Sequence, residues 1–348
     1  MTMLKKITVY GLFNENDFEI PLSGDCITYI HSRNGLGKST IMKLVYSILA
    51  GELEEARTVP FERVDLDFDT GTSIIVENRN QELTVQASRN GLEENISIED
   101  LRGVKRVVYI GPDRAYARDA DGHLAMSLPL YMIRLSKRIQ AAMRDSEPRK
   151  VPAGGEDRTD ADIDRWFRDL EAKVEFIKQA GFAPEIPSGY RFPPSRYEIG
   201  EYRSDYLALA ASLQDYVDRY YSFAESIVVY KDIINTIYID KTVSLNEAGY
   251  FEARMDRSGT VVPLDKFSSG EKQMLIIFYL ILFETEPGSL VILDEPEVSL
   301  HVTWQHELGR VLRDLCRLRS LQVLMATHAP SVIHDDWDLT TELKADRE

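Results

Sequence analysis

Ser32-Arg33-Asn34-Gly35-Leu36-Gly37-Lys38-Ser39-Thr40 is the stretch that decides the fold class. It follows the apolar run Ile27–Ile30, which predicts a strand. It opens the segment Ser39–Leu49, whose apolar spacing predicts a helix that ends at Gly51. A glycine-containing loop between a strand and a helix N-terminus is the context of a phosphate-binding loop. The sequence therefore predicts an α/β protein that binds phosphate groups.

The chemistry of this loop assigns a role to each residue type. Gly35 and Gly37 let the backbone fold so that N–H groups point at phosphate oxygens, and the helix dipole adds positive potential. Lys38 is expected to contact the β- and γ-phosphates, and the Ser39 hydroxyl to be a Mg²⁺ ligand. Ser32 departs from the pattern, which has a glycine at that position. The residues expected to bind nucleotide are Asn34, Gly35, Leu36, Gly37, Lys38, Ser39 and Thr40.

Two carboxylates follow a second apolar run, Leu290–Leu293. Four consecutive aliphatic residues predict a buried parallel strand, and ligands of open α/β sheets bind at the carboxyl ends of such strands. Asp294 is therefore expected to hold Mg²⁺ through a bound water. Glu295 is expected to act as the general base that polarises an attacking water, which makes it a catalytic residue together with Lys38.

A third motif, Phe267-Ser268-Ser269-Gly270-Glu271-Lys272-Gln273, opens the apolar segment Glu271–Phe283. It resembles the signature motif of ABC-type ATPases, with Ser269 in place of a glycine and Glu271 in place of a glutamine. The resemblance implies that Ser268, Ser269, Gly270 and Glu271 meet the γ-phosphate of an ATP bound by another copy. Two copies would then enclose ATP between them. The hydroxyl of Ser268 and the helix N-terminus suit such an anion site.

The order of the remaining motifs narrows the resemblance. Ser299-Leu300-His301 corresponds to the loop that crosses the dimer interface in ABC-type ATPases, and Thr327-His328 to their switch histidine. The run Glu295–His301, followed by Trp304-Gln305, is similar to the RecF/OLD/SMC-related branch (the AAA_15/AAA_21-like proteins). This resemblance implies that His328 is catalytic. In that branch a Mg²⁺-sensing glutamine stands near the position of Gly111-Pro112-Asp113-Arg114; the role of these residues, and the residue that stacks on adenine, stay open.

The implied fold is α/β, a P-loop NTPase of ABC-ATPase type with a split head, an antiparallel β lobe and a helical insertion. The head would consist of residues 1–118 and 241–348, and the insertion of residues 119–240. Within the insertion, Ser127–Met143 and Ile163–Ala180 are predicted helices, and residues 145–162 a linker. Residues from Trp337 onward are expected to be a loose polar tail.

Apolar residues recur every three or four positions from Tyr206 to Ile237, which predicts one long helix with a heptad seam. The seam could hold a second copy, or it could pack inside the chain against the stripe Trp166, Leu170, Val174 and Ile177. Aromatic seam residues favour packing inside the chain.

Composition excludes several classes of protein. The 348 residues carry 57 acidic and 41 basic side chains, a net charge of −16, which excludes a protein that coats nucleic acid with uniform basic charge. Two cysteines make no disulfide framework and fit a reducing cytosol. No targeting signal is seen, and the longest apolar run, Met274–Phe283, is too short to span a bilayer. A cytoplasmic protein without membrane contact is expected.

One segment departs from the acidic average. Arg102–Lys150 contains eleven basic and five acidic residues, a net charge of +6. It could contact DNA or an acidic partner, or it could be a solvated helix face; both interpretations stay open.

The function implied is an ATP-binding and ATP-hydrolysing switch. The resemblance points to ATPase subunits of bacterial antiphage systems, which form homo-oligomers through ATP and control a partner effector or DNA. About twenty residues follow His328, too few for a nuclease domain, so a separate nuclease or toxin is expected. The alternative is a RecF-like ATPase of DNA repair that acts directly on DNA. A transporter cassette is disfavoured by the long gap between Lys38 and the signature, and a non-catalytic scaffold by Glu295.

Overall fold

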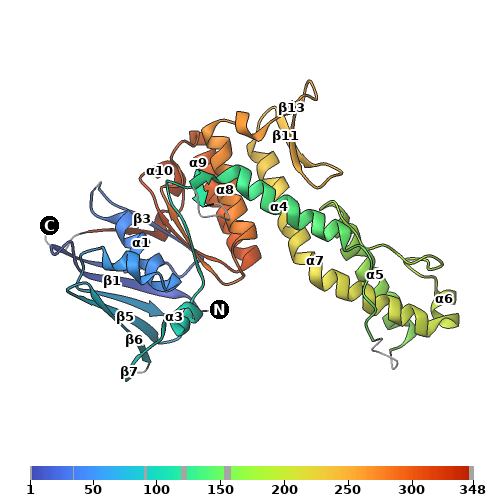
Figure 1. The fold of residues 1–348 in the computed structure, drawn as a ribbon, viewed down its shortest axis with the longest axis horizontal. Coiled ribbons are helices and arrows are strands. Elements are labelled where there is room, and N and C mark those ends of the chain that lie inside the picture. Colours follow the sequence, from blue (N-terminus) through green and yellow to red (C-terminus); the bar gives the residue numbers. More distant parts are fainter. Residues whose placement is uncertain (1, 34, 90–91, 119–123, 153–157, 345–348) are drawn as a thin grey trace. The chain divides into compact units, whose positions relative to one another are not determined.

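The computed structural model describes residues 2–33, 35–89, 92–118, 124–152 and 158–344. They form two compact units (Figure 1). Unit 1 combines Met1–Ala115 with Glu284–Glu348, and unit 2 is Tyr116–Phe283. Each unit is described by itself below.

Unit 1 contains two sheets. The antiparallel sheet has the order β2-β1-β4-β5-β6-β7, from strands β1 (Leu4–Leu12), β2 (Asn16–Pro21), β4 (Arg63–Phe68), β5 (Thr72–Arg79), β6 (Glu82–Arg89) and β7 (Leu92–Asn95). The parallel sheet has the order β16-β3-β15-β14-β8, from strands β3 (Ile27–His31), β8 (Val107–Ile110), β14 (Leu290–Asp294), β15 (Gln322–Ala326) and β16 (Thr340–Glu342). The strand predicted at Ile27–Ile30 is confirmed as β3, and the antiparallel sheet agrees with the expected β lobe.

Helix α1 (Lys38–Ala50) joins the two sheets of unit 1 through one hydrophobic cluster. Its apolar face, including Ile41, Val45 and Ile48, is buried together with residues of β1, β4, β14 and β15. It ends as predicted at Gly51, whose φ of 68° lets its N–H bond back to the last turn. The other helices of unit 1 are α2 (Leu53–Arg57), α3 (Ile98–Val104), α9 (Val302–Arg319), α10 (Pro330–Ile333) and the 3₁₀ turn η2 (Trp337–Leu339).

The central strands β14 and β15 are buried along their whole length. Parallel strands covered on both faces require such continuous apolar runs, which is why both were visible in the sequence. Because β3, β14 and β15 are parallel neighbours, the loops after all three emerge at the same sheet edge. These loops carry the phosphate-binding stretch, the two carboxylates and the histidine.

Unit 2 is mainly helical. Its helices are α4 (Ser127–Arg144), α5 (Asp160–Lys178), α6 (Arg196–Glu201), α7 (Arg203–Ile237) and α8 (Ser269–Phe283), with the 3₁₀ turn η1 (Leu264–Lys266). Its small sheets pair β9 (Tyr116–Arg118) with β10 (Leu124–Met126), and β11 (Lys241–Leu245) with β12 (Phe251–Met255) and β13 (Val261–Val262). Figure 1 shows α5 beside α7, with α6 at the end of this pair.

The heptad seam packs inside the chain. Helix α7 runs without a break over 35 residues, and its seam residues Tyr206 and Leu213 are buried. Rings of α5 and α7 meet edge to face, as for Phe167 and Tyr206, whose centroids are 5.9 Å apart. Trp166 donates a hydrogen bond from Nε1 to Gln214. Further along α7, Tyr230 packs against Phe283 of α8 and donates a hydrogen bond to the Leu275 carbonyl. The seam is thus covered within the chain by α5 and α8, which confirms the packing inside the chain that the sequence favoured.

Three boundaries differ from prediction because of capping interactions or an added strand. Helix α5 begins earlier than predicted, since Thr159 and Asp162 form a capping box. Ser195 and Glu198 form another, which starts α6 in residues 182–200, where four prolines predict an irregular loop. The prediction of a loose tail from Trp337 is wrong for the described part: β16 pairs with β3, and Leu343 is buried.

The predicted domains were defined by sequence motifs, whereas the two units are defined by how the chain packs. The helical unit includes β11–β13 and α8, segments that the prediction assigned to the ATPase head on the strength of the signature. The division into head and insertion stays a prediction. Among the helices that the structure describes, none is both long and apolar enough to cross a membrane.

Candidate nucleotide-binding site

The loop between β3 and α1 is built around left-handed backbone at two glycines. Gly35 and Gly37 have φ values of 86° and 87°, a region that side chains with a Cβ rarely adopt. A Cβ on Gly37 would lie 3.0 Å from the Leu12 side chain. Asn34, one of the predicted nucleotide contacts, lies outside the described residues. Both glycines therefore adopt a backbone conformation that favours glycine, as the loop was predicted to require.

Lys38 bends back over this loop. Its Nζ donates hydrogen bonds to Oγ of Ser32, at 2.9 Å, and to the Ser32 carbonyl, at 3.3 Å. Burial lowers the pKa of Lys38, while the charges of Glu295, Asp294 and Glu297 act in the opposite direction. The serine in place of the usual glycine supplies an oxygen that holds the lysine at the mouth of the loop.

The carboxylate of Asp294 is fully buried and accepts two hydrogen bonds. Ser39 donates from Oγ to Oδ1 at 3.1 Å, and Tyr109 donates from its hydroxyl to Oδ2 at 2.8 Å. Burial first, and then the adjacent Asp294, raise the pKa of Tyr109. Ser39 and Asp294, the two predicted metal ligands, are thus in direct contact, and their oxygens are of the kind that Mg²⁺ prefers.

Glu295 and His328 face each other across the same sheet edge. His328 Nε2 lies 3.5 Å from Glu295 Oε1, and His328 Nδ1 lies 3.4 Å from Lys38 Nζ. Glu295 has a φ of 47°, uncommon for a residue with a side chain, and its N–H bonds to the carbonyl of Ala326 in β15. Three residues predicted to be catalytic, far apart in the sequence, therefore lie together.

A cavity of about 590 Å³ opens between these groups. It is lined by Phe13, Gly35, Gly37, Lys38, Ser39, Thr40, Glu295 and His328. Leu36 lies at the loop but packs against the hydrophobic cluster of unit 1. Phe13, which the sequence did not single out, is 44% exposed at the turn between β1 and β2. It is the one aromatic side chain among these lining residues.

The roles of Arg114 and Glu297 were not predicted from the sequence. Arg114 is buried and donates to the carbonyls of Gly111 and Pro296, so it connects the end of β8 to the loop after β14. Glu297 accepts hydrogen bonds from the Thr327 hydroxyl and from the His328 N–H. The spacing of two residues after Glu295 gave no signal for this, because the partner loop comes from another strand.

The signature residues stand at the start of α8 in unit 2. Glu271 Oε2 accepts hydrogen bonds from the N–H and the hydroxyl of Ser268, and the Ser268 hydroxyl accepts from the Glu271 N–H. Lys241 forms an ion pair with the other carboxylate oxygen. Burial would raise the pKa of Glu271, but the bonds from Lys241 and Ser268 prevail and lower it. Glu271 is therefore a helix cap, while Ser269 and Gly270 form the first turn.

The loop after Glu297 is also shaped by left-handed backbone. Ser299 has a φ of 68°, and the His301 side chain accepts a hydrogen bond from the Thr303 N–H at the start of α9. Val298 and His301 are exposed.

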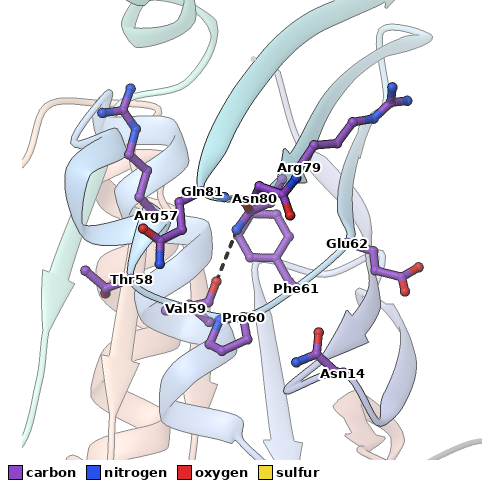
Figure 2. A pocket seen from close by; sticks show the side chains of 11 residues that line it. Asn14, Arg57, Thr58, Val59, Pro60, Phe61, Glu62, Arg79, Asn80 and Gln81 are labelled. Atoms are coloured by element: carbon purple, nitrogen blue, oxygen red, sulfur yellow. Dashed lines mark hydrogen bonds between the residues drawn. The ribbon is translucent and has the colours of Figure 1, made fainter.

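A second cavity of about 530 Å³ lies on the other side of the β1–β2 turn. Figure 2 shows Phe61 in its middle, with Arg57 and Glu62 on opposite sides. Asn78 donates from its side chain to the carbonyl of Val59. The two arginines at this rim are exposed and form ion pairs, Arg57 with Glu54 and Arg79 with Glu77. It lacks the buried lysine and the paired hydroxyl and carboxylate of the first cavity.

Residues 131–334, more than half of the chain, match the AAA_21 family, described as "AAA domain, putative AbiEii toxin, Type IV TA system". The chain belongs to this family. Members share an AAA domain, and here the match includes the signature residues, Asp294, Glu295 and His328. A search of the curated proteins finds no match.

Two solved structures are similar along almost the whole chain. The Smc head domain of Pyrococcus furiosus, with an extended coiled coil and bound to the C-terminal domain of ScpA, has a TM-score of 0.51 at 13% identity over 99% of this chain and 96% of that one. An SmcHead bound to the C-winged helix domain of ScpA has a TM-score of 0.51 at 13% identity over 98% and 97%. These likenesses confirm the predicted fold, an α/β P-loop NTPase of ABC type that is similar in fold to SMC heads.

Proposed function

We propose that this protein binds and hydrolyses ATP with Mg²⁺, and that two copies close around ATP to form a switch that controls a partner effector. The proposal rests on one observation: Lys38, Glu295 and His328 line a single cavity next to the Ser39–Asp294 contact. Membership of the AAA_21 family and the ABC-type fold support it.

The residues at the loop fit a nucleotide with its metal. Positive φ at Gly35 and Gly37 and the N-terminus of α1 suit phosphate oxygens, and the adjacent oxygens of Ser39 and Asp294 suit a divalent cation. When bound, Mg²⁺ supplies positive charge that neutralises the β- and γ-phosphates. Phe13 is the side chain that we propose to lie against the base.

The protein's own groups then divide the remaining chemistry. The Glu295 carboxylate accepts a proton from the attacking water. The His328 imidazole, within 3.5 Å of Glu295, orients that water and the γ-phosphate by hydrogen bonds. Lys38 places a positive charge on the phosphates; burial lowers its pKa, while the charges of Glu295, Asp294 and Glu297 favour its charged form.

The second copy would contribute its signature residues. Ser268 and the N-terminus of α8 form an anion site. A carboxylate at Glu271 would repel phosphate, but its ion pair with Lys241 neutralises it and its bonds hold Ser268 at the helix start. The proposed role of Glu271 is therefore to shape this site, with Ser269 and Gly270 supplying backbone N–H groups.

A protein partner suits the basic segment better than duplex DNA does. Of its eleven basic residues, Lys105 and Arg114 are buried, and Arg106 and Arg149 form ion pairs with acidic neighbours. On α4, Arg138 lies 4.7 Å from the ring of Phe223 and donates to the Phe283 carbonyl. Similar folds bound to ScpA domains show that heads of this shape take separate protein partners, which supports a separate effector here. A nuclease or toxin in antiphage defence remains our specific proposal.

Phosphate release from ATP tests the enzymatic part. The wild type should release phosphate only with Mg²⁺, and Glu295→Gln should lower turnover by about 100-fold or more, by analogy with the loss of a general base. Glu307→Gln, the same change on the exposed face of α9, should have no effect. Equal turnover of Glu295→Gln and wild type would refute the assignment.

Duplex DNA separates the two candidate functions. If the protein controls a separate effector, DNA leaves the turnover of the wild type unchanged. A stimulation of tenfold or more that is lost in Arg134→Glu with Lys137→Glu would instead favour a RecF-like enzyme that acts directly on DNA. Both side chains are exposed on α4, so the double change should not disturb folding.

A further inference from the structure

Glu297 connects two loops that both enter the proposed nucleotide site. It follows Asp294–Pro296 at the end of β14, and its Oε1 reaches the loop after β15. There it accepts a hydrogen bond from the Thr327 hydroxyl at 2.7 Å and another from the His328 backbone N–H at 2.8 Å. The Thr327 hydroxyl in turn accepts from the Ala329 N–H at 3.0 Å. One carboxylate oxygen thus fixes the start of the loop that carries the histidine.

The Thr327 end of this network is shielded from water, whereas His328 is exposed. Thr327 is fully buried, and the second carboxylate oxygen of Glu297 is buried without a hydrogen-bond partner among the described residues. Burying a carboxylate in this way costs free energy unless cations are near. Arg114 is one such cation: burial lowers its pKa to about 10, while Glu297 and then Asp294 favour its charged form. Burial of a carboxylate at such a cost in free energy is expected where a functional side chain has to be held in one position.

The side chain that this network positions is that of His328. Its two ring nitrogens lie 3.5 Å from Glu295 Oε1 and 3.4 Å from Lys38 Nζ, and its backbone N–H is the group that Glu297 holds. Loss of the acceptor would free the Thr327 hydroxyl and the His328 N–H at once. The histidine would then no longer be held in place beside Glu295.

We propose that Glu297 is a positioning residue, which acts through the Thr327-His328 backbone to hold the histidine in register with Glu295. The effect of Glu297 on turnover rests on the proposed ATPase function. Its structural role, holding the loop that carries His328, does not. Glu297 touches neither Lys38 nor Ser39 through a hydrogen bond in the described residues. It should therefore affect turnover far more than it affects the binding of ATP.

Steady-state kinetics with matched variants test the chemical half. Glu297→Ala should lower kcat about 10- to 100-fold and leave KM for ATP within about threefold, as for interactions made in the transition state. Glu297→Gln keeps an oxygen that accepts both hydrogen bonds, so it should retain kcat within about threefold of the wild type. Thr327→Val, which removes one of the two donors, should fall between them. Glu307→Ala, which removes an exposed carboxylate paired with Arg310, is the control and should behave as the wild type.

Amide hydrogen exchange of residues 327–329 tests the structural half without turnover. Glu297→Ala should speed exchange at the His328 N–H at least tenfold, whereas Glu297→Gln and Glu307→Ala should not. Unchanged exchange in Glu297→Ala, or a kcat within threefold of the wild type, overturns the inference. So does a Glu297→Gln variant as slow as Glu297→Ala, because the charge and not the acceptor would then matter. If the wild type releases no phosphate at all, the proposed function fails, while the exchange result still decides whether Glu297 holds the loop.

Discussion

Removal of the Tyr109 hydroxyl gives a sharp test of the geometry at Asp294. Asp294 is fully buried, and in the described residues its carboxylate accepts one hydrogen bond from Ser39 and one from Tyr109, the latter at 2.8 Å. A hydrogen bond to a charged group contributes about 1.5–3 kcal/mol, and an unsatisfied buried charge costs at least as much. Tyr109→Phe should therefore lower the free energy of unfolding by about 1.5–3 kcal/mol, since it removes one of the two donors to a buried carboxylate.

The neighbouring Tyr46 supplies a matched control. Its ring lies 5.7 Å from that of Tyr109, but its hydroxyl donates to Glu52 at the surface, at 3.2 Å. Tyr46→Phe makes the same chemical change and should cost less than about 0.5 kcal/mol, because water can replace an exposed hydrogen bond. Urea unfolding in the absence of nucleotide, followed by circular dichroism, measures both values. A cost for Tyr109→Phe no larger than that for Tyr46→Phe would refute the view that Asp294 depends on Tyr109.

Three further variants probe other features. Lys38→Met should lower ATP affinity by about tenfold to hundredfold in a binding titration without loss of stability, since burial already lowers the pKa of Lys38; unchanged affinity would exclude it as a phosphate ligand. Burial lowers the pKa of Lys105 to about 8. Below pH 8 the side chain is therefore charged in both the folded and the unfolded state, and burial of this charge destabilises the folded state. Lys105→Met should thus be more stable than the wild type by about 1–3 kcal/mol at pH 7, and the difference should shrink from pH 8 to 10.5, where only the unfolded wild type keeps the proton; a constant difference would contradict this. Leu213→Ala, at a fully buried seam position, should cost about 2–5 kcal/mol in urea unfolding and leave the mass of the nucleotide-free protein unchanged; a change in that mass would show that the seam joins copies.

The chemical motifs could be predicted because each is continuous in the sequence. The loop at Lys38 needs a strand, glycines and a helix in one short stretch, and the carboxylates at Asp294 follow directly on their buried strand. The family match and the fold comparisons bear out the class that these motifs predicted. The positions of Glu295 and His328 beside Lys38 followed from the general rule that parallel strands end at one edge.

What escaped prediction depends on neighbours that are distant in the sequence. Tyr109 reaches Asp294 because β8 pairs with β14, with Tyr109 opposite Ile292, a pairing that no local pattern reveals. Arg114 and Glu297 owe their roles to carbonyls and N–H groups of other loops. Strand β16 has only three residues, too few for alternation to be recognised; its pairing with β3 and a hydrogen bond from the Thr341 hydroxyl to the Pro21 carbonyl hold it.

The seam of α7 shows the limit of periodicity. The pattern predicted the helix and its apolar stripe correctly but could not name the partner, since a heptad repeat fits a second copy as well as another helix of the same chain. Contacts within the chain name the partners: α5 for the N-terminal half, as Phe167 against Tyr206 at 5.9 Å, and α8 for the C-terminal half, as Phe283 against Tyr230 at 5.6 Å. We therefore propose that two copies associate only through bound ATP, and not through the seam of α7.

The mass of Glu295→Gln in solution, measured by light scattering with ATP and Mg²⁺, tests directly whether two copies close around ATP. Because this variant is expected to bind ATP without hydrolysing it, closed pairs should accumulate. The account predicts a shift from the 39.7 kDa of one chain to twice that value, absent without nucleotide and absent when Lys38→Met is added. A mass that stays at one chain under every condition, with ATP bound, would contradict closure of two copies around the nucleotide.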